Sequence, residues 1–397
     1  MSATSSSRPI VSGIGISQIG RKSAVSGLDL TCESSRQAIA DAGLTPADID
    51  GISTMGETPL IEAGQALGIE PKYKGGGYDR GGLLSPVMAA AEAVRTGAAR
   101  HVLVYRTVKM MDGAVISKDD ASPVQSFASP PPLPLAEAGP PTGMGDMAQL
   151  IAYHGYAAPN WLAMHCNRYM HLYGAKKEQL GWLAVNSRRN AALNPRAVYR
   201  TPFTLDEYMA ARMISTPFGL LDCDVPIDGS IACVVSHAGY AADCPKLPVR
   251  IEAFGGTDGV GGWTMRPDYP KMASVDAAAE MWAKTDLKPS DIDMAQLYDG
   301  FTFLTFAWLE ALGICKDGEA GPFVEGASRI ALDGEMPLNT YGGQLSAGRM
   351  HGYWVLHEAV LQMRREAGER QVKKQKLDVA VVASGGGPIA GSMLLTR

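Results

Sequence analysis

A pattern of seven residues, L-x-P-x-D-I-D, occurs twice in this chain and constrains its fold more than any other feature. The two copies lie at residues 44–50 and 287–293. Downstream of each copy come the tetrapeptide Ala-Leu-Gly-Ile, a pair of glycines, a helical stretch and an apolar strand, in the same order. Features that keep one order in both parts indicate two copies of one α/β half, duplicated and packed together.

Strands and helices alternate in both halves, and this alternation predicts mixed, mainly parallel sheets covered by helices. We expect an N-terminal half at residues 1–109 and 146–245 and a C-terminal half at residues 246–397. The elements behind this prediction are strands at residues 10–16, 51–54, 101–105 and 378–382 and helices at residues 28–42, 177–193 and 275–284.

An insertion at residues 110–145 interrupts the first half and is rich in Pro, Ala, Gly and Met. Its proline clusters, at residues 130–132 and 140–141, are incompatible with a long helix or a central strand. We therefore expect a long loop that serves either as a lid or as a subunit contact.

The composition argues against several classes of protein. The formal net charge is −5 and no basic block stands out, so a nucleic-acid partner is not expected. The six cysteines have no C-x-x-C spacing, which favours reduced thiols of a cytoplasmic protein over a zinc site or a disulfide framework. No apolar run reaches the roughly 18 residues of a membrane span. Residues 1–9 lack the apolar core of a secretory signal.

The segment at residues 339–352 (NTYGGQLSAGRMHG) concentrates the candidate chemistry of the chain. Tyr341, Ser346, Arg349 and His351 stand there among four glycines. Glycines let a backbone adopt positive φ and approach a ligand closely. The alternative is a tight strand-to-helix turn whose polar residues only cap and solvate it.

The middle of the chain resembles the sterol-carrier-type thiolases of the thiolase superfamily. The resemblance implies a five-layer αβαβα fold built from two duplicated halves, a homodimer, and an acyl-CoA substrate bound between the halves at helix N-termini. The segments that carry it are residues 173–174, 178–180, 194–197, 212–217 and 228–229.

Three departures from the thiolase pattern bear on the chemistry. Leu84 stands where such thiolases carry a nucleophilic cysteine, and Arg349 stands where their G-H-P loop has its base. The thiolase C-x-G-G-G turn reads A-S-G-G-G here, at residues 383–387. An acyl-enzyme needs a thiolate and a base that activates it, so these replacements argue against ordinary thiolysis.

A second resemblance points to a different reaction. The Y-D-G-F sequence at residues 298–301, together with the glycine-rich loop at residues 342–352, is similar to the thiolase-like aldolases of steroid side-chain degradation, also described as lipid-transfer proteins. The resemblance implies retro-aldol cleavage of a β-hydroxyacyl-CoA and a complex with a small OB-fold acyl-CoA-binding protein. In that family a second tyrosine usually stands at the position of Arg349.

Retro-aldol cleavage needs a base for the β-hydroxyl group and donors that hold the thioester enolate, but no covalent nucleophile. Tyr298 is the candidate base and acid. Arg349 is expected to lower the pKa of Tyr298 by favouring the phenolate, or to hold an oxyanion. Tyr341, His351 and Ser346 would complete a proton relay or donate to the thioester oxygen.

Other residues are assigned to binding. Gly343, Gly386 and Gly387 are expected to allow close approach of the substrate. Asp299 is a candidate for substrate binding, although capping of a helix over the apolar run at residues 301–309 is its simpler interpretation.

Simpler interpretations also stay open for the catalytic candidates. Tyr298 would be a half-buried packing residue, His351 a structural histidine and Arg349 a salt-bridge partner. No metal or separate cofactor is expected, because CoA is part of the substrate. The cluster of His165, Arg168, Tyr169 and His171 lacks suitably spaced carboxylates and is interpreted as a helix surface.

Two other functions remain possible at this point. One is an acyltransferase or Claisen-type thiolase that works without a cysteine. The other is a non-catalytic subunit that binds acyl-CoA or lipid while a partner does the chemistry. The acyl group itself is not fixed, although apolar residues of the proline-rich loop and around Trp263 would suit a sterol-sized pocket.

Overall fold

The computed structural model describes residues 8–397 apart from 57, 79, 112–145 and 258–261, so nearly all of the predicted loop at 110–145 lies outside the described residues. Among the described residues, nine strands form one sheet in the order β3-β2-β4-β7-β1-β8-β11-β10-β9, and β5 (Met213–Ser215) pairs separately with β6 (Phe218–Gly219). The strands of the large sheet are β1 (Ile10–Ile16), β2 (Gly51–Thr54), β3 (Tyr73–Gly76), β4 (His101–Lys109), β7 (Asp228–Ser236), β8 (Val249–Gly256), β9 (Met294–Leu297), β10 (Val379–Gly386) and β11 (Ile389–Thr396).

The helices match the sequence periodicity closely. The predicted helices at residues 28–42, 177–193 and 275–284 correspond to α1, α6 and α8 within two residues at either end. The α-helices are α1 (Gly27–Asp41), α2 (Leu60–Leu67), α3 (Ser85–Arg95), α4 (Met147–Ala152), α5 (Ala158–Tyr173), α6 (Lys177–Ala192), α7 (Leu205–Met209), α8 (Ser274–Trp282), α9 (Thr302–Ala311), α10 (Ala320–Val324) and α11 (Tyr353–Met363).

The strand order confirms the duplicated halves. It reads β2-β4-β7-β1 on one side of the central junction and β9-β10-β11-β8 on the other. In each set the outermost pair is parallel and the next two pairs are antiparallel. The sets meet where β1 pairs with β8, and β3 is an additional strand at the edge of the first set. Antiparallel pairs are more frequent than expected, because β11 follows β10 through a tight turn and β7 takes the equivalent place beside β4.

The repeated seven-residue pattern has one structural purpose in both halves. Its first aspartate caps a single helical turn, since Asp48 accepts from the Thr45 N–H and Asp291 accepts from the Lys288 N–H, both at 2.8 Å. Its second aspartate, Asp50 in the first half, binds backbone N–H groups at the start of β4. The equivalent residue of the second half does the same at the start of β10. The pattern therefore joins each turn to the neighbouring strand.

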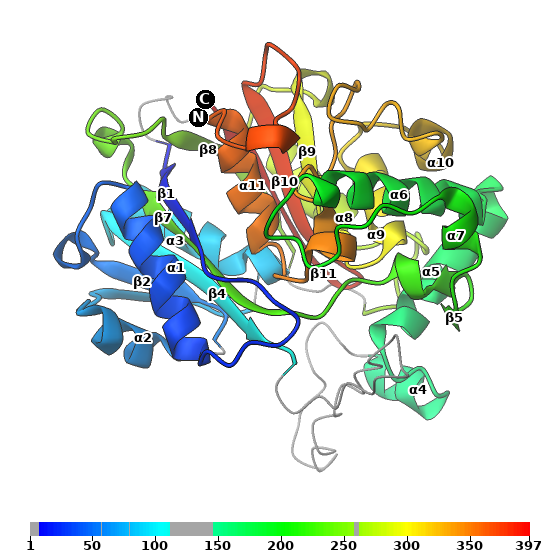
Figure 1. Cartoon of the computed structure of the whole chain (residues 1–397), viewed down its shortest axis with the longest axis horizontal. Coiled ribbons are helices and arrows are strands. Elements are labelled where there is room, and N and C mark those ends of the chain that lie inside the picture. Colours follow the sequence, from blue (N-terminus) through cyan, green and yellow to red (C-terminus); the bar gives the residue numbers. More distant parts are fainter. Residues whose placement is uncertain (1–7, 57, 79, 112–145, 258–261) are drawn as a thin grey trace.

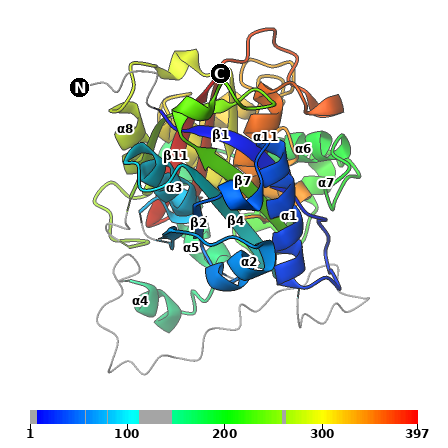
Figure 2. The same ribbon diagram turned by 90° about the vertical axis from the view of Figure 1, so that its left-hand side faces the viewer.

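In the described part of the chain, five layers pack around three hydrophobic cores. One core lies between α1 with α2 and the outer face of the first strand set. A second surrounds α3 and α11, which lie between the two strand sets. The third lies between the second strand set and α5, α6, α8, α9 and α10. Figure 1 shows the two outer helical groups on opposite sides of the molecule, and Figure 2 shows α1 and α2 on the outer side of β2 and β4. The arrangement is the expected αβαβα fold.

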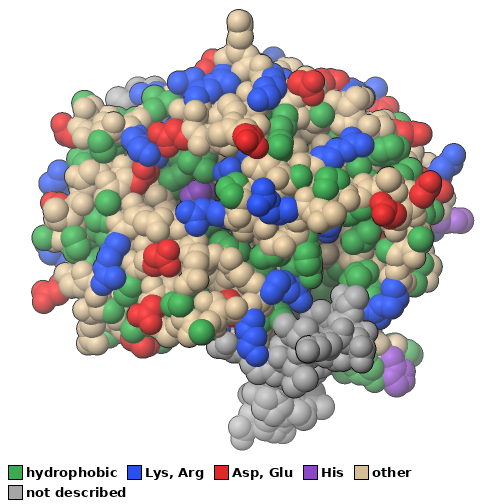
Figure 3. All heavy atoms as spheres, viewed as in Figure 1, with side chains coloured by type: hydrophobic (Ala, Val, Ile, Leu, Met, Phe, Trp, Pro, Cys, Tyr) green, Lys and Arg blue, Asp and Glu red, His purple; other side chains and the backbone are tan. Residues whose placement is uncertain are grey.

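Among the described residues, no helix combines the length and the apolar composition that crossing a bilayer requires. On the face shown in Figure 3, lysine and arginine side chains are interspersed with aspartate and glutamate.

Candidate active site

Tyr298 follows β9 directly, and its backbone N–H donates to the Ala383 carbonyl of β10 at 2.9 Å. Its side chain is half-buried. The ring folds back over Gly300, where an added Cβ would lie 2.6 Å from the ring carbon Cε1. The glycine of the Y-D-G-F sequence therefore leaves room for one fixed orientation of the tyrosine ring.

Asp299 links the two motifs that the sequence singles out. Its carboxylate is buried and accepts from the Gln344 N–H at 2.7 Å and from the Ser187 hydroxyl at 3.4 Å. It thereby caps the π-helical turn Gly343–Ala347. The prediction that it caps the following helix is wrong, because α9 has Phe301 at its N-cap and no side-chain cap bond. Asp299 does cap a helical turn, as expected, but that turn is Gly343–Ala347 of the glycine-rich loop.

Gly343 is required by this cap. Its φ is +62°, and an added Cβ would lie 1.8 Å from the Asp299 Oδ2. Burial raises the pKa of Asp299 to about 7, although the backbone N–H bonds to its carboxylate lower the pKa. These contacts assign Asp299 and Gly343 to the architecture of the site, and their predicted contact with substrate remains a prediction.

Arg349 meets a residue that the sequence analysis missed, Asp224. The Arg349 Nη1 lies 3.3 Å from the Asp224 Oδ1, and the two side chains are 12% and 7% exposed. The backbone around Asp224 is bonded to both motifs: its N–H donates to the Gly300 carbonyl, and the N–H of Val225 donates to the Gln344 carbonyl. No motif or periodicity marks Asp224, so only the fold brings it to the site.

The electrostatics of Tyr298 differ from the prediction. Burial raises its pKa well above the ordinary value, the Asp224 carboxylate raises it further, and the Arg349 charge lowers it. The predicted effect of Arg349 is present, but the expected net lowering is wrong because desolvation outweighs it. Tyr298 is therefore a protonated phenol near neutral pH. Burial also raises the pKa of Asp224, to about 6, although Arg349 opposes the shift.

His351 contacts Arg106, a second residue that the sequence analysis missed. The Arg106 Nη2 lies 3.0 Å from the His351 Nδ1. Burial and the charges of Arg106 and Arg349 hold the pKa of His351 well below its ordinary value, so the ring is neutral. A guanidinium only donates, so Nδ1 accepts and the ring proton lies on Nε2. His351 is thus a hydrogen-bond donor through Nε2–H.

Two further polar residues lie close to this group. The charge of Arg106 lowers the pKa of Tyr78, although burial raises it overall, and Tyr78 in turn acts on Tyr298. Gln344 is fully buried, and neither atom of its side-chain amide has a partner among the described residues. A buried amide without partners is costly, and a bound ligand or water would relieve that cost.

Tyr341 and Ser346 have mainly structural contacts. The Tyr341 ring is fully buried and stacked on Trp354, with centroids 5.3 Å apart, and its hydroxyl has no partner among the described residues. The Ser346 hydroxyl accepts from the Arg188 Nε at 2.8 Å. No hydrogen bond between described residues connects either side chain to Tyr298, so the proposed relay lacks a visible path.

Gly386 and Gly387 allow close packing. An added Cβ at Gly386 would clash with Leu304, and one at Gly387 would clash with the ring of Trp263. The interpretation of His165, Arg168, Tyr169 and His171 as a helix surface is wrong for His165 and Tyr169, which are both buried. Both ring nitrogens of His165 lie within 3.0 Å of backbone carbonyls.

The thiolase nucleophile has no replacement at its own position. Leu84 is completely buried in the central core. The nearest cysteine in sequence to the site residues is Cys223, whose pKa is raised by burial and by the Asp222 and Asp224 carboxylates. A thiol with a raised pKa is a poor nucleophile.

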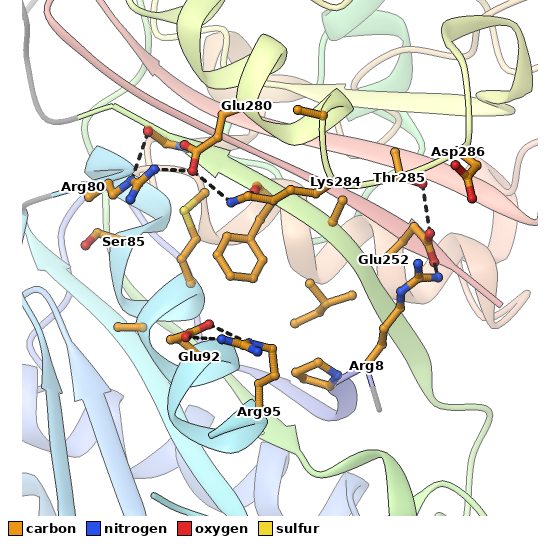
Figure 4. Close-up of a pocket in the computed structure, with 18 of the residues that line it drawn as sticks. Arg8, Arg80, Ser85, Glu92, Arg95, Glu252, Glu280, Lys284, Thr285 and Asp286 are labelled. Atoms are coloured by element: carbon orange, nitrogen blue, oxygen red, sulfur yellow. Dashed lines mark hydrogen bonds and ion pairs between the residues drawn. The ribbon is translucent and has the colours of Figure 1, made fainter. Parts of the chain in front are cut away.

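A large hollow of about 1010 Å³ lies elsewhere, between α3, β8 and α8 (Figure 4). None of the predicted site residues lines it. Ion pairs join most of the charged residues of its lining, as in Arg80–Glu280, Arg8–Glu252 and Lys284–Glu280. Size alone would therefore point to the wrong place for the chemistry.

Comparisons with known proteins agree with the site. Residues 261–396 match the family described as "Thiolase C-terminal domain-like". The chain is 35% identical over 373 residues to 17-hydroxy-3-oxo-4-pregnene-20-carboxyl-CoA lyase of Mycobacterium tuberculosis, across 90% of this chain and 92% of that protein. It is 34% identical over 400 residues to the steroid side-chain-cleaving aldolase of Thermomonospora curvata, across 97% of each.

A solved structure shows the same relationship. The Ltp2-ChsH2(DUF35) aldolase superposes with a TM-score of 0.85 at 32% identity, across 98% of both chains. An acetyl-CoA acetyltransferase from Syntrophomonas wolfei, at 16% identity and a TM-score of 0.66, shares the fold. The chain belongs to the thiolase-like steroid side-chain-cleaving aldolases.

Proposed function

We propose that the chain cleaves a β-hydroxyacyl-CoA with a steroid or bile-acid side chain by a retro-aldol reaction, releasing a ketone and a short acyl-CoA. The observation that carries this proposal is the environment of Tyr298. A protonated phenol is held in one orientation beside a guanidinium and a carboxylate, without a reactive thiolate at the site. Proton transfer is the chemistry that such groups supply.

The other polar residues suit the thioester. Breaking the Cα–Cβ bond leaves a negative charge on the thioester enolate, and preorganised donors lower the energy of that charge. The His351 Nε2–H and the Gln344 amide are such donors. Tyr298, as a phenol with a raised pKa, is the acid that protonates the enolate carbon. No redox cofactor is needed, since the reaction is redox-neutral.

Tyr298→Phe tests the function directly. The variant removes one hydroxyl and keeps the ring that packs over Gly300, so we expect the fold to survive and cleavage to fall by about 10²–10⁴-fold. Cleavage is measured as ketone release from a panel of steroid β-hydroxyacyl-CoAs. Tyr240→Phe is the matched control, because the Tyr240 hydroxyl donates to the Ala42 carbonyl, remote from the site. Full activity of Tyr298→Phe would end the proposal.

The same preparations decide between the alternatives. An acyl-enzyme detected by mass spectrometry would indicate a transferase that works without the usual cysteine. Tight binding of CoA esters with no turnover would indicate a non-catalytic subunit.

We further propose that the chain works in the cytoplasm as a homodimer together with an OB-fold acyl-CoA-binding partner. The solved aldolase carries two components in its name, Ltp2 and ChsH2, which supports a second subunit. β3 lies at one edge of the sheet, so a second copy would pair there. The hollow of Figure 4 includes Gly76 of β3 and lies beside that edge. Light scattering of the chain with and without its co-expressed partner measures both associations.

A further inference from the structure

Two buried carboxylates, Asp299 and Asp224, flank Tyr298, and both act on its pKa. A retro-aldol reaction has two proton transfers, and a protonated tyrosine can only begin as the donor in one of them. The reaction proposed above, on which this inference rests, therefore needs a separate group that accepts the β-hydroxyl proton.

Asp299 is already occupied. Its carboxylate accepts from the Gln344 N–H and the Ser187 hydroxyl, and the Leu345 N–H and the Asn339 side chain stabilise it as well. The backbone of Gly343 lies against its Oδ2, since even one added carbon there would clash. These contacts leave no face of the carboxylate for a substrate hydroxyl.

Asp224 is held differently. Its carboxylate accepts from the Arg349 guanidinium at 3.3 Å. Its backbone N–H donates to the Gly300 carbonyl, two residues beyond Tyr298, so the backbone at Asp224 is held close to that of the tyrosine. The backbone N–H of Arg349 donates to the Val225 carbonyl at 2.8 Å, and the ion pair with Asp224 holds the guanidinium. Fixed geometry of this kind is what a general base requires.

We propose that Asp224 is the catalytic base that takes the proton of the β-hydroxyl group, while Tyr298 protonates the enolate carbon and Arg349 positions the carboxylate. The substrate class is a β-hydroxyacyl thioester whose hydroxyl carbon becomes a ketone. The assignment also gives Arg349 a role in the reaction, through its contact with Asp224.

The step balances without any further reactant. The Asp224 carboxylate takes the hydroxyl proton, the C=O bond of the ketone forms, and the Cα–Cβ bond breaks. Its electron pair passes to the thioester enolate, and the Tyr298 hydroxyl donates a proton to Cα. This leaves a carboxylic acid and a phenolate. A proton then passes from Asp224 to Tyr298, directly or through water, and both groups regain their starting forms.

The acidities of the two groups support this division. Burial raises the pKa of Asp224 only to about 6, because Arg349 opposes the shift, so the carboxylate is mostly ionised at pH 7. Tyr298 is raised far enough to stay protonated. When their environments move the pKa values of two neighbouring groups apart, the group with the lower pKa acts as the base and the other as the acid. The titratable or charged groups that share the field of Asp224 are Arg349, Tyr298, Cys223 and Tyr341.

Two variants test the base in the full complex. Asp224→Asn keeps the shape of the side chain, and we expect kcat to fall by about 10²–10⁴-fold with little change in KM. The acidic limb of the pH–rate profile, near pH 6 in the wild type, should disappear. Asp224→Ala opens space for a small carboxylate, and added formate should restore part of the rate.

Asp299→Ala is the matched control for the second variant. It removes a neighbouring buried carboxylate that caps a turn, so it should lower the melting temperature and gain nothing from formate. The proposal is overturned if Asp224→Asn keeps kcat within threefold of the wild type. It is also overturned if Asp224→Ala folds but formate gives no recovery and the acidic limb persists.

Failure of this inference differs from failure of the proposed function. If the wild type cleaves and Tyr298→Phe does not, but the Asp224 variants remain active, only the base assignment fails. If the wild-type complex cleaves no β-hydroxyacyl-CoA, both proposals fail together.

Discussion

Gly343→Ala should break the contact that joins the two motifs of the site. The new Cβ would meet the Asp299 Oδ2 at 1.8 Å, so the carboxylate must leave its position over the π-helical turn. A hydrogen bond to a charged group contributes about 1.5–3 kcal/mol. Placing alanine in the left-handed region at φ +62° costs about 1–2 kcal/mol. Loss of one bond plus this strain lowers the free energy of unfolding by about 2.5–5 kcal/mol.

This loss converts into a measurable temperature. Unfolding entropy is about 2.1 cal/mol/K per residue, or about 0.8 kcal/mol/K for 397 residues. The melting temperature of Gly343→Ala should therefore fall by about 3–6 °C in a calorimetric scan. Cleavage should fall as well, because the displaced Asp299 is the residue next to Tyr298.

Gly368→Ala isolates the strain. Gly368 has the same φ of +62°, but an added Cβ there meets nothing within 4 Å. Its melting temperature should fall by only about 1–3 °C. In a background that already carries Asp299→Ala, Gly343→Ala should cost no more than this control, because the clashing carboxylate is gone. Equal melting temperatures for Gly343→Ala and Gly368→Ala in the wild-type background would refute the reasoning.

Two other predictions concern the same loop. Tyr341→Phe should change the free energy of unfolding by less than about 1 kcal/mol, because the hydroxyl that it removes has no partner among the described residues; a larger loss in chemical denaturation would show a hidden bond. Arg349→Met should move the acidic limb of kcat/KM above pH 6, because Arg349 lowers the pKa of Asp224 and a carboxylate base is active only above its pKa. Arg349→Lys keeps the charge and should leave the limb near its wild-type position, and a limb unmoved in Arg349→Met would contradict the pairing.

The fold was predictable because its signals repeat. The two copies of L-x-P-x-D-I-D carry aspartates whose contacts are the same in both halves. The same sequence pattern therefore predicted the same local structure in each half. The first strand, at residues 10–16, coincides with β1 because a short apolar run with glycines permits few other structures. The choice between parallel and antiparallel neighbours was less accessible, since it depends on where β7 and β11 return in the sheet.

The sequence predicted only those site residues that belong to a recognisable motif. Tyr298 and Arg349 lie in recognisable sequences, and the fold brings both to Asp224. Asp224 and Arg106 come from unmarked segments, and no spacing rule relates them to either motif. The cap formed by Asp299 was assigned to the wrong helix because sequence distance favours the nearest one, whereas its true partner, the Gln344 N–H, is 45 residues away.

The sign of the pKa shift of Tyr298 was the least accessible quantity, because it depends on burial as well as on charge. A guanidinium nearby lowers the pKa, and that much follows from the presence of Arg349. The same guanidinium also stabilises the Asp224 carboxylate, and that negative charge raises the pKa of Tyr298 again. One cation thus serves two groups in opposite senses.

This sharing explains why Arg349 and Asp224 belong together. A neutral phenol in place of Arg349 would not compensate the buried carboxylate of Asp224. Removing one partner of a buried ion pair typically costs about 3–5 kcal/mol, so a chain with tyrosine at 349 would have to lose the charge at 224 or protonate it. The arginine and the aspartate therefore form one acid–base unit, in which the cation favours the ionised carboxylate, and burial together with that carboxylate keeps the phenol of Tyr298 protonated.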